Sequence, residues 1–261
     1  MRHHELTIAA FTASQAVRPE VLGVVIVGSV ARGEERPDSD VDVYLVVTDE
    51  AYAAAERSAQ VAFVSDIGVN YEGGYVDVKL ASPSYLAAAA DHGDDPTRAS
   101  FETGRVTLDR LGELTALVAQ MAILPAGVWG QRVRTYRAQL GLYGGYFLVQ
   151  AADRGDRFLL LHSAVHASLA AGRCALAQHR RLFRGQKYLA GDVAALTGLP
   201  EGFLDSWWKI IEKPSPGAAR TLIAVTDAWL GQPLTVDEAL SAFIAANELG
   251  WLNRTIPPEY W

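Results

Sequence analysis

Two aspartates at the start of a β-like segment are the residues of this chain whose types and spacing most clearly favour chemistry. Asp40 and Asp42 open an apolar run that continues to Val47, shortly after the turn Gly28-Ser29 that closes an earlier apolar run. Alternate side chains of a strand project to one face, so the two carboxylates point together. Converging carboxylates repel one another unless a cation lies between them, and oxygen ligands of this kind suit Mg2+. The pattern therefore predicts a magnesium site beside a turn whose backbone N–H groups can receive phosphate oxygens.

The longer motif around these aspartates resembles a known signature. The segment Gly28–Gly33 reads Gly-Ser-Val-Ala-Arg-Gly, and Ser39–Asp42 reads Ser-Asp-Val-Asp. Together they resemble the signature of the DNA polymerase beta-type nucleotidyltransferase superfamily, and they are similar to its small stand-alone members, the minimal nucleotidyltransferases and antibiotic-modifying adenylyltransferases. The resemblance covers the first third of the chain and implies a third carboxylate on a later strand. Asp77, inside the β-rich run Tyr75–Leu80, supplies it.

The resemblance implies an activity as well as a metal site. The implied protein is a metal-dependent enzyme. It transfers a nucleoside monophosphate, AMP from ATP in the first instance, to an acceptor hydroxyl and releases pyrophosphate. Asp40, Asp42 and Asp77 would be the catalytic residues and the ligands of two Mg2+ ions, with ATP or another NTP as co-substrate. Asp77, or a nearby carboxylate such as Glu102, would take the proton of the acceptor hydroxyl. A non-catalytic nucleotide-binding regulatory module is the alternative from another class, and the presence of all three carboxylates argues against it.

Five residues are expected to contribute to nucleotide binding. Gly28 and Ser29 would offer N–H and O–H groups to the terminal phosphates. Arg32 carries a guanidinium whose fork suits phosphate oxygens, and an ordinary surface role is open for it too. Ser39 is expected chiefly to cap its turn and to orient the aspartate that follows. The resemblance also implies that a basic residue of the helical half contacts the phosphates, and Lys187 is the candidate. We give equal weight to the interpretation that Lys187 belongs to a solvated basic helix face.

The periodicity of the chain changes near Gly112. Before it, β-like runs alternate with short helical ones, and after Glu113 helical periodicity dominates up to the helix that a capping box opens at Thr235. We therefore predict an α+β protein. Residues 1–112 would form a small mixed-sheet nucleotidyltransferase core with helices packed on it, and residues 113–261 an all-α helical bundle.

Composition narrows the class of protein. The chain has 261 residues, 50% of them hydrophobic, with a formal net charge of −7 and a pI of about 5.4. A chain with this hydrophobic content can bury a core. An acidic protein lacks the positive charge of a non-specific nucleic-acid binder, so a long nucleic acid is disfavoured as a partner, while a tRNA end stays open. We expect no membrane-spanning run and a cytoplasmic enzyme, since NTP is found there. The oligomeric state is left open.

Three other residues have chemistry-bearing side chains that we interpret as structural. His162 and His166 lie one helical turn apart, which is a zinc-ligand spacing, but no third ligand accompanies them. Cys174 is the only cysteine, so no disulfide can form within the chain. It lies in an alanine-rich helical run and is expected to be a core residue.

The acceptor is the least determined part of the function. We take the helical half as acidic, on carboxylates such as Asp205, Glu212 and Glu248, and this favours a cationic small molecule such as an aminoglycoside. A tRNA end or a protein side chain, modified by a toxin-type nucleotidyltransferase, is the alternative acceptor.

Overall fold

The structure is a computed structural model that describes residues 1–231 and 233–258. The chain divides into two compact units, Met1–Ile123 and Leu124–Trp261. The division therefore follows Ile123, where we had expected it near Gly112. The helix α6 (Leu114–Met121) accounts for the difference, because its apolar side chains are buried against the sheet of the first unit.

The first unit is built on a five-stranded mixed sheet with the strand order β3-β4-β2-β1-β5. Strand β1 pairs antiparallel with β2 and β5, β2 pairs parallel with β4, and β3 pairs antiparallel with β4. The strands are β1 (Val21–Val27), β2 (Val41–Val47), β3 (Ala62–Ser65), β4 (Val76–Ala81) and β5 (Arg105–Asp109). The helices are α1 (Arg2–Gln15), α2 (Gly28–Arg32), α3 (Asp49–Arg57), α4 (Pro83–His92), α5 (Asp95–Phe101) and α6.

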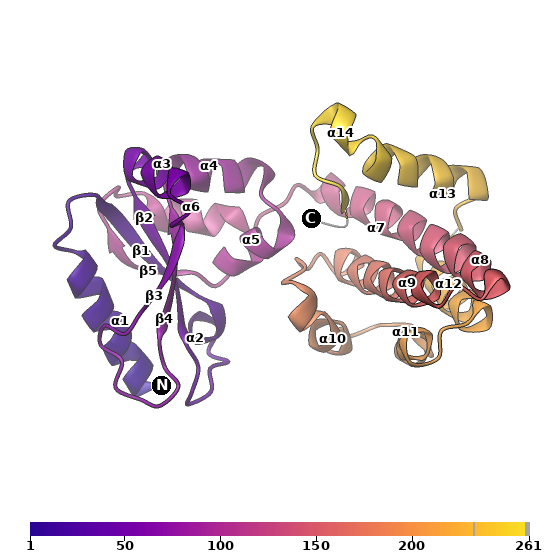
Figure 1. Ribbon diagram of the computed structural model, residues 1–261, viewed down its shortest axis with the longest axis horizontal. Coiled ribbons are helices and arrows are strands. Elements are labelled where there is room, and N and C mark those ends of the chain that lie inside the picture. Colours follow the sequence, from indigo (N-terminus) through magenta and orange to yellow (C-terminus); the bar gives the residue numbers. More distant parts are fainter. Residues whose placement is uncertain (232, 259–261) are drawn as a thin grey trace. The chain divides into compact units, whose positions relative to one another are not determined.

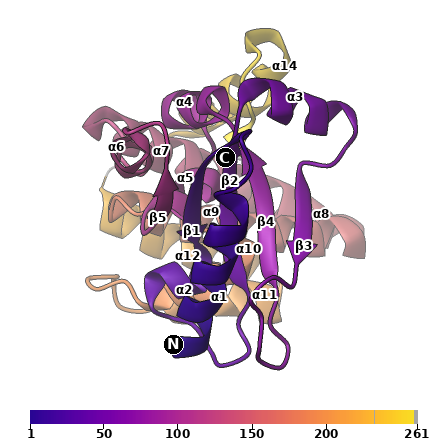
Figure 2. The ribbon, with the colours of Figure 1, turned by 90° about the vertical axis from the view of Figure 1, so that its left-hand side faces the viewer.

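The two faces of the sheet are covered by different helices (Figures 1 and 2). Ile8 and Phe11 of α1 pack with Val24, Val43 and other side chains of one strand parity. The opposite parity packs with residues of α4, α5 and α6. This division follows from the period-two alternation of strands, and it determines which helices lie behind each side chain of the sheet.

Strand β3 was not expected from the sequence. Its residues are exposed or only partly buried, and it lies at one edge of the sheet. Because neither of its faces is fully covered, no apolar alternation marks it. It forms through its pairing with β4, where Phe63 lies opposite Val78.

The described residues of the second unit form helices and connecting loops without a strand, which confirms the expected α+β class with a sheet core followed by helices. Its long helix α9 (Arg157–Gln178) lies at the centre of the hydrophobic core, with alanines that let neighbouring helices approach closely. The other elements are α7 (Ala126–Leu140), the π-helix η1 (Gly141–Phe147), α8 (Leu148–Arg154), α10 (Gln186–Ala194), α11 (Phe203–Glu212), α12 (Pro216–Leu230), α13 (Val236–Phe243), the π-helix η2 (Ile244–Glu248) and α14 (Gly250–Asn253).

Two helical stretches of the described residues are long and apolar enough to cross a membrane by length and composition, where we had expected none: Leu114–Arg154 and Arg157–Gln178. The second is α9, and 61% of its apolar window is buried inside the protein. For the first the buried share is 17%, and it crosses the division between the two units. The core helix of a folded bundle passes the same test, so length and composition alone do not assign a membrane segment here.

Candidate active site

The three aspartates singled out by the sequence lie together at one end of the sheet. Asp42 on β2 has Val27 of β1 as its register partner on one side and Asp77 of β4 on the other. Asp40 lies two residues before Asp42 and shares its parity, and the three carboxylates approach so that one oxygen from each lies within 4.8 Å of the others. The expected convergence of Asp40, Asp42 and Asp77 on one face is therefore present. Parallel pairing of β2 with β4 produces it, because parallel register places equivalent positions side by side.

The turn at Gly28 leaves room for this cluster. Gly28 has a φ of +71°, and a Cβ added to it would lie 1.8 Å from Oδ2 of Asp42. Only glycine fits at a position that combines a left-handed backbone with so close an approach. The Gly-Ser turn therefore lies directly against the middle carboxylate of the three.

Tyr75 lies at the rim of the cluster. It lies immediately before β4, two residues from Asp77, and it is 39% exposed. A hydrogen bond to Asp40, together with the negative charge of Asp40, Asp77 and Asp42, raises the pKa of the Tyr75 hydroxyl. The raised pKa reflects a concentration of negative charge, which favours the binding of a cation.

A divalent cation fits this donor set. All three side chains supply carboxylate oxygens, which are the ligands that Mg2+ prefers, and all three are only partly buried. No other group of three or more histidine, cysteine or acidic side chains placed to hold a metal is found in the described part of the chain. Asp42 would hold the cation from β2, Asp40 from the position just before β2, and Asp77 from β4.

Comparison with known proteins points to the same residues. Residues 12–83, which include the Gly28 turn and all three aspartates, match the family described as nucleotidyltransferase domain. Residues 12–83 are a nucleotidyltransferase domain. The match supports a nucleotidyltransferase enzyme.

Solved structures agree with the fold. A nucleotidyltransferase-like protein from Exiguobacterium sibiricum superposes with a TM-score of 0.51 at 13% identity, over 96% of this chain and 80% of that one. A likeness at this identity establishes the fold, including the helical part that follows the nucleotidyltransferase domain. No protein of curated function matches the sequence.

Ser29 and Arg32, which were expected to bind phosphate, lie close in sequence to the clustered aspartates, and their local environments differ from one another. Ser29 follows the turn and is partly buried on α2. The Arg32 guanidinium forms an ion pair with Glu34, Nε to Oε2 at 2.7 Å, and the Arg32 side chain is 14% exposed. Binding of a triphosphate by Arg32 would require this guanidinium to share or leave Glu34.

Ser39 caps its turn, as expected: its Oγ accepts a hydrogen bond from the Arg36 backbone N–H at 2.9 Å. Its carbonyl accepts two more hydrogen bonds, from the Tyr71 hydroxyl and from His4. The hydroxyl and the carbonyl of Ser39 are thus both hydrogen-bonded within the protein, and Ser39 is a turn residue beside Asp40.

Two expected participants, Lys187 and Glu102, are not among the residues of the carboxylate cluster. Lys187 is exposed on α10 of the second unit, with its Nζ 5.0 Å from the centre of the Tyr188 ring. Glu102 is exposed at the C-terminal end of α5 and is not one of the three clustered carboxylates.

The residues interpreted as structural are found in structural positions. His162 and His166 form part of a ring stack with Tyr143, with the two imidazole centres 4.2 Å apart. Cys174 is fully buried. Burial raises the pKa of its thiol to about 12, so it is not a nucleophile in the folded protein.

Sequence reasoning missed the residues that lie around the cluster and the turn before it. Tyr75 could have been found from the period of two that relates it to Asp77. His4 and Tyr71 carry no local signal, because their relation to Ser39 spans 35 and 32 residues of sequence.

Proposed function

We propose that this protein transfers a nucleoside monophosphate, AMP from ATP in the first instance, to a hydroxyl of an acceptor and releases pyrophosphate. The observation that carries the proposal is the convergence of Asp40, Asp42 and Asp77 beside the Gly28 turn, inside a nucleotidyltransferase domain. A cytoplasmic location, where NTP is available, belongs to the same proposal.

The roles of the residues follow from their positions. When bound, Mg2+ neutralises charge on the triphosphate and on the leaving pyrophosphate and lowers the pKa of the acceptor hydroxyl. Asp42 on β2 and Asp40 just before it would hold the metal at the triphosphate end of the site. Asp77 lies across from Asp42 on β4 and accepts the proton of the acceptor hydroxyl. The Gly28-Ser29 turn orients the phosphates, so positioning and charge neutralisation supply most of the rate enhancement.

The charges of the two units bear on the acceptor, and they correct one expectation. Residues 124–261 contain 14 Lys and Arg against 11 Asp and Glu, and residues 1–123 contain 9 against 19. The helical half is thus not acidic: its carboxylates, such as Asp205, Glu212 and Glu248, are outnumbered by basic residues. The argument for a cationic small molecule such as an aminoglycoside loses its basis in charge. The surplus of positive charge favours the alternative, an anionic acceptor such as a tRNA end.

Release of pyrophosphate from Mg-ATP across a panel of acceptors tests the function. The panel holds aminoglycosides, a tRNA mixture and a protein substrate mixture, each assayed with the wild type and with the Asp40→Asn, Asp42→Asn double variant. We expect acceptor-dependent pyrophosphate release by the wild type and none by the variant. ATP binding without pyrophosphate release on any acceptor would support the regulatory-module alternative. Equal release by the two proteins would refute the assignment of the aspartates.

A further inference from the structure

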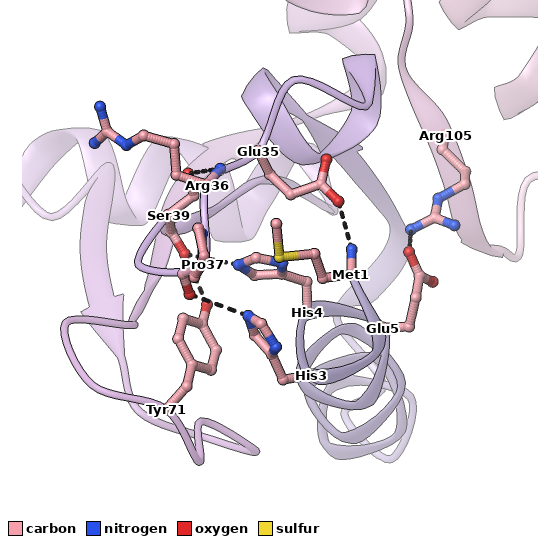
Figure 3. Close-up of polar contacts among 10 residues, drawn as sticks. All are labelled: Met1, His3, His4, Glu5, Glu35, Arg36, Pro37, Ser39, Tyr71 and Arg105. Carbon is pink, nitrogen blue, oxygen red and sulfur yellow. Dashed lines mark hydrogen bonds and ion pairs between the residues drawn. The ribbon is translucent and has the colours of Figure 1, made fainter.

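The carbonyl of Ser39, the residue immediately before Asp40, is held by two side chains from separate parts of the first unit. The Tyr71 hydroxyl donates to it at 2.8 Å, and Nε2 of His4 lies 3.1 Å from it. His4 lies on α1, whereas Tyr71 belongs to the loop that leads into β4. Figure 3 shows both side chains directed at the Ser39 carbonyl.

The His4 imidazole is arranged as a neutral donor. A carbonyl can only accept, so Nε2 carries the proton and Nδ1 is left with its lone pair. The side chain is fully buried, and Nδ1 has no hydrogen-bond partner among the described residues. Burial and the neighbouring His3 lower the pKa of His4, which keeps it in this neutral form. The hydrogen bond to the Ser39 carbonyl is therefore the polar interaction that the buried His4 ring makes among the described residues.

The rings around His4 fix its orientation. The His4 ring centre lies 4.1 Å from that of His3 and 4.9 Å from that of Tyr71. His3 in turn has its Nε2 3.0 Å from the carbonyl of Pro37. The three rings therefore hold the 37–39 backbone at two carbonyls.

The peptide that these donors hold has no sheet partner of its own. Strand β2 and its ladder begin at Val41, where the Val41 N–H donates to the carbonyl of Tyr75 at 2.9 Å. Asp40 lies between this first ladder hydrogen bond and the Ser39 carbonyl. The orientation of the Ser39–Asp40 peptide sets the direction of the Asp40 Cα–Cβ bond, and with it the place of its carboxylate relative to Asp42 and Asp77.

We propose that His4 and Tyr71 are positioning residues of the metal site, which act by fixing the Ser39–Asp40 peptide so that the Asp40 carboxylate stays with the other two. The inference rests on the proposed function in so far as it takes the three aspartates as metal ligands. Through His4, helix α1 becomes part of the support of the site, although its face of the sheet lies opposite the carboxylates. Outer hydrogen-bond partners of metal ligands have this effect generally.

Metal affinity separates positioning from ordinary structural support. The experiment titrates the full chain with Mn2+ in the absence of nucleotide, follows free Mn2+ by electron paramagnetic resonance, and measures urea unfolding of each variant without metal. Tyr71→Phe removes the hydroxyl and keeps the ring. His4→Leu removes the donor, and His4→Gln restores an amide donor near the place of Nε2.

Two matched variants serve as controls. Tyr52→Phe removes a tyrosine hydroxyl from α3, and Thr12→Val removes the hydroxyl with which α1 contacts Thr107 at 2.9 Å. Neither residue contacts the 37–40 segment by a hydrogen bond in the described structure. Both controls therefore measure the loss of a hydroxyl away from the site.

We expect Tyr71→Phe and His4→Leu each to weaken Mn2+ binding by about three- to tenfold, the equivalent of one lost hydrogen bond. His4→Gln recovers most of the affinity, and the controls stay within about twofold of wild type. Mn2+ affinities of Tyr71→Phe and His4→Leu that equal those of the controls would overturn the inference and leave the proposed function standing. Should His4→Leu fail to fold, Tyr71→Phe decides. Wild-type protein that binds Mn2+ but releases no pyrophosphate would refute the proposed function alone, whereas absence of Mn2+ binding by the wild type would overturn both.

Discussion

Replacing Gly28 by alanine is the sharpest test of the site geometry. The new Cβ would lie 1.8 Å from Oδ2, 2.6 Å from Cγ and 2.9 Å from Cβ of Asp42. Ordinary carbon contacts are about 3.5 Å or longer, so the Asp42 carboxylate has to move by about 1.5 Å. It cannot stay in place by small adjustment, because the atoms in conflict include the Cβ that fixes its position on the strand.

The cost of Gly28→Ala has two parts that a control separates. The left-handed φ of +71° costs an alanine about 1–2 kcal/mol of stability. Displacement of a ligand by more than 1 Å costs about 10²-fold in activity. Gly33 has a φ of +70°, and a Cβ added there meets nothing within 4 Å. Gly33→Ala therefore carries the same backbone strain without the clash.

The assay compares the two variants by urea unfolding, Mn2+ titration and pyrophosphate release. We expect both to lose about 1–2 kcal/mol of stability, and only Gly28→Ala to lose metal binding together with about 10²-fold in activity. Wild-type Mn2+ affinity in Gly28→Ala would refute the reasoning. So would an equal loss of affinity in Gly33→Ala, since strain alone would then explain the effect.

Three further predictions concern charge and titration. Asp77→Asn removes one of three repelling charges, so the metal-free protein keeps its stability or gains up to about 1 kcal/mol, while the rise in Tm that Mg2+ gives the wild type disappears in a thermal scan. His4 has its pKa lowered below 6.5 by burial and by His3, so the unfolded chain binds more protons in that window and stability falls as the pH drops from 6.5 toward the lowered value. His4→Gln flattens this slope in urea unfolding measured at several pH values, and an unchanged slope would contradict the assignment. The Cys174 thiol, whose pKa burial raises to about 12, reacts with a disulfide reagent at pH 8 only at the rate of unfolding, which a fast reaction in native buffer would disprove.

The local features of the site were readable from the sequence. The alternation of Asp40 with Asp42 and the Gly28-Ser29 turn are patterns of near neighbours, and strand geometry translates them directly into side-chain direction. The helical character of the second unit is equally local, because the period of its apolar residues requires no knowledge of what they pack against. The charge of the second unit was also present in the sequence, and a full count corrects the interpretation drawn from three carboxylates.

Long-range contacts decided the rest. The parallel register that makes Asp42 and Asp77 neighbours depends on how the chain crosses over between β2 and β4. The edge strand β3 exists only through its partner, and α6 belongs to the first unit because that unit buries its apolar face. The two donors on the Ser39 carbonyl reach it across 35 and 32 residues. Such pairings depend on the packing of whole elements, and a single sequence carries no periodic signal for a contact between two residues that far apart.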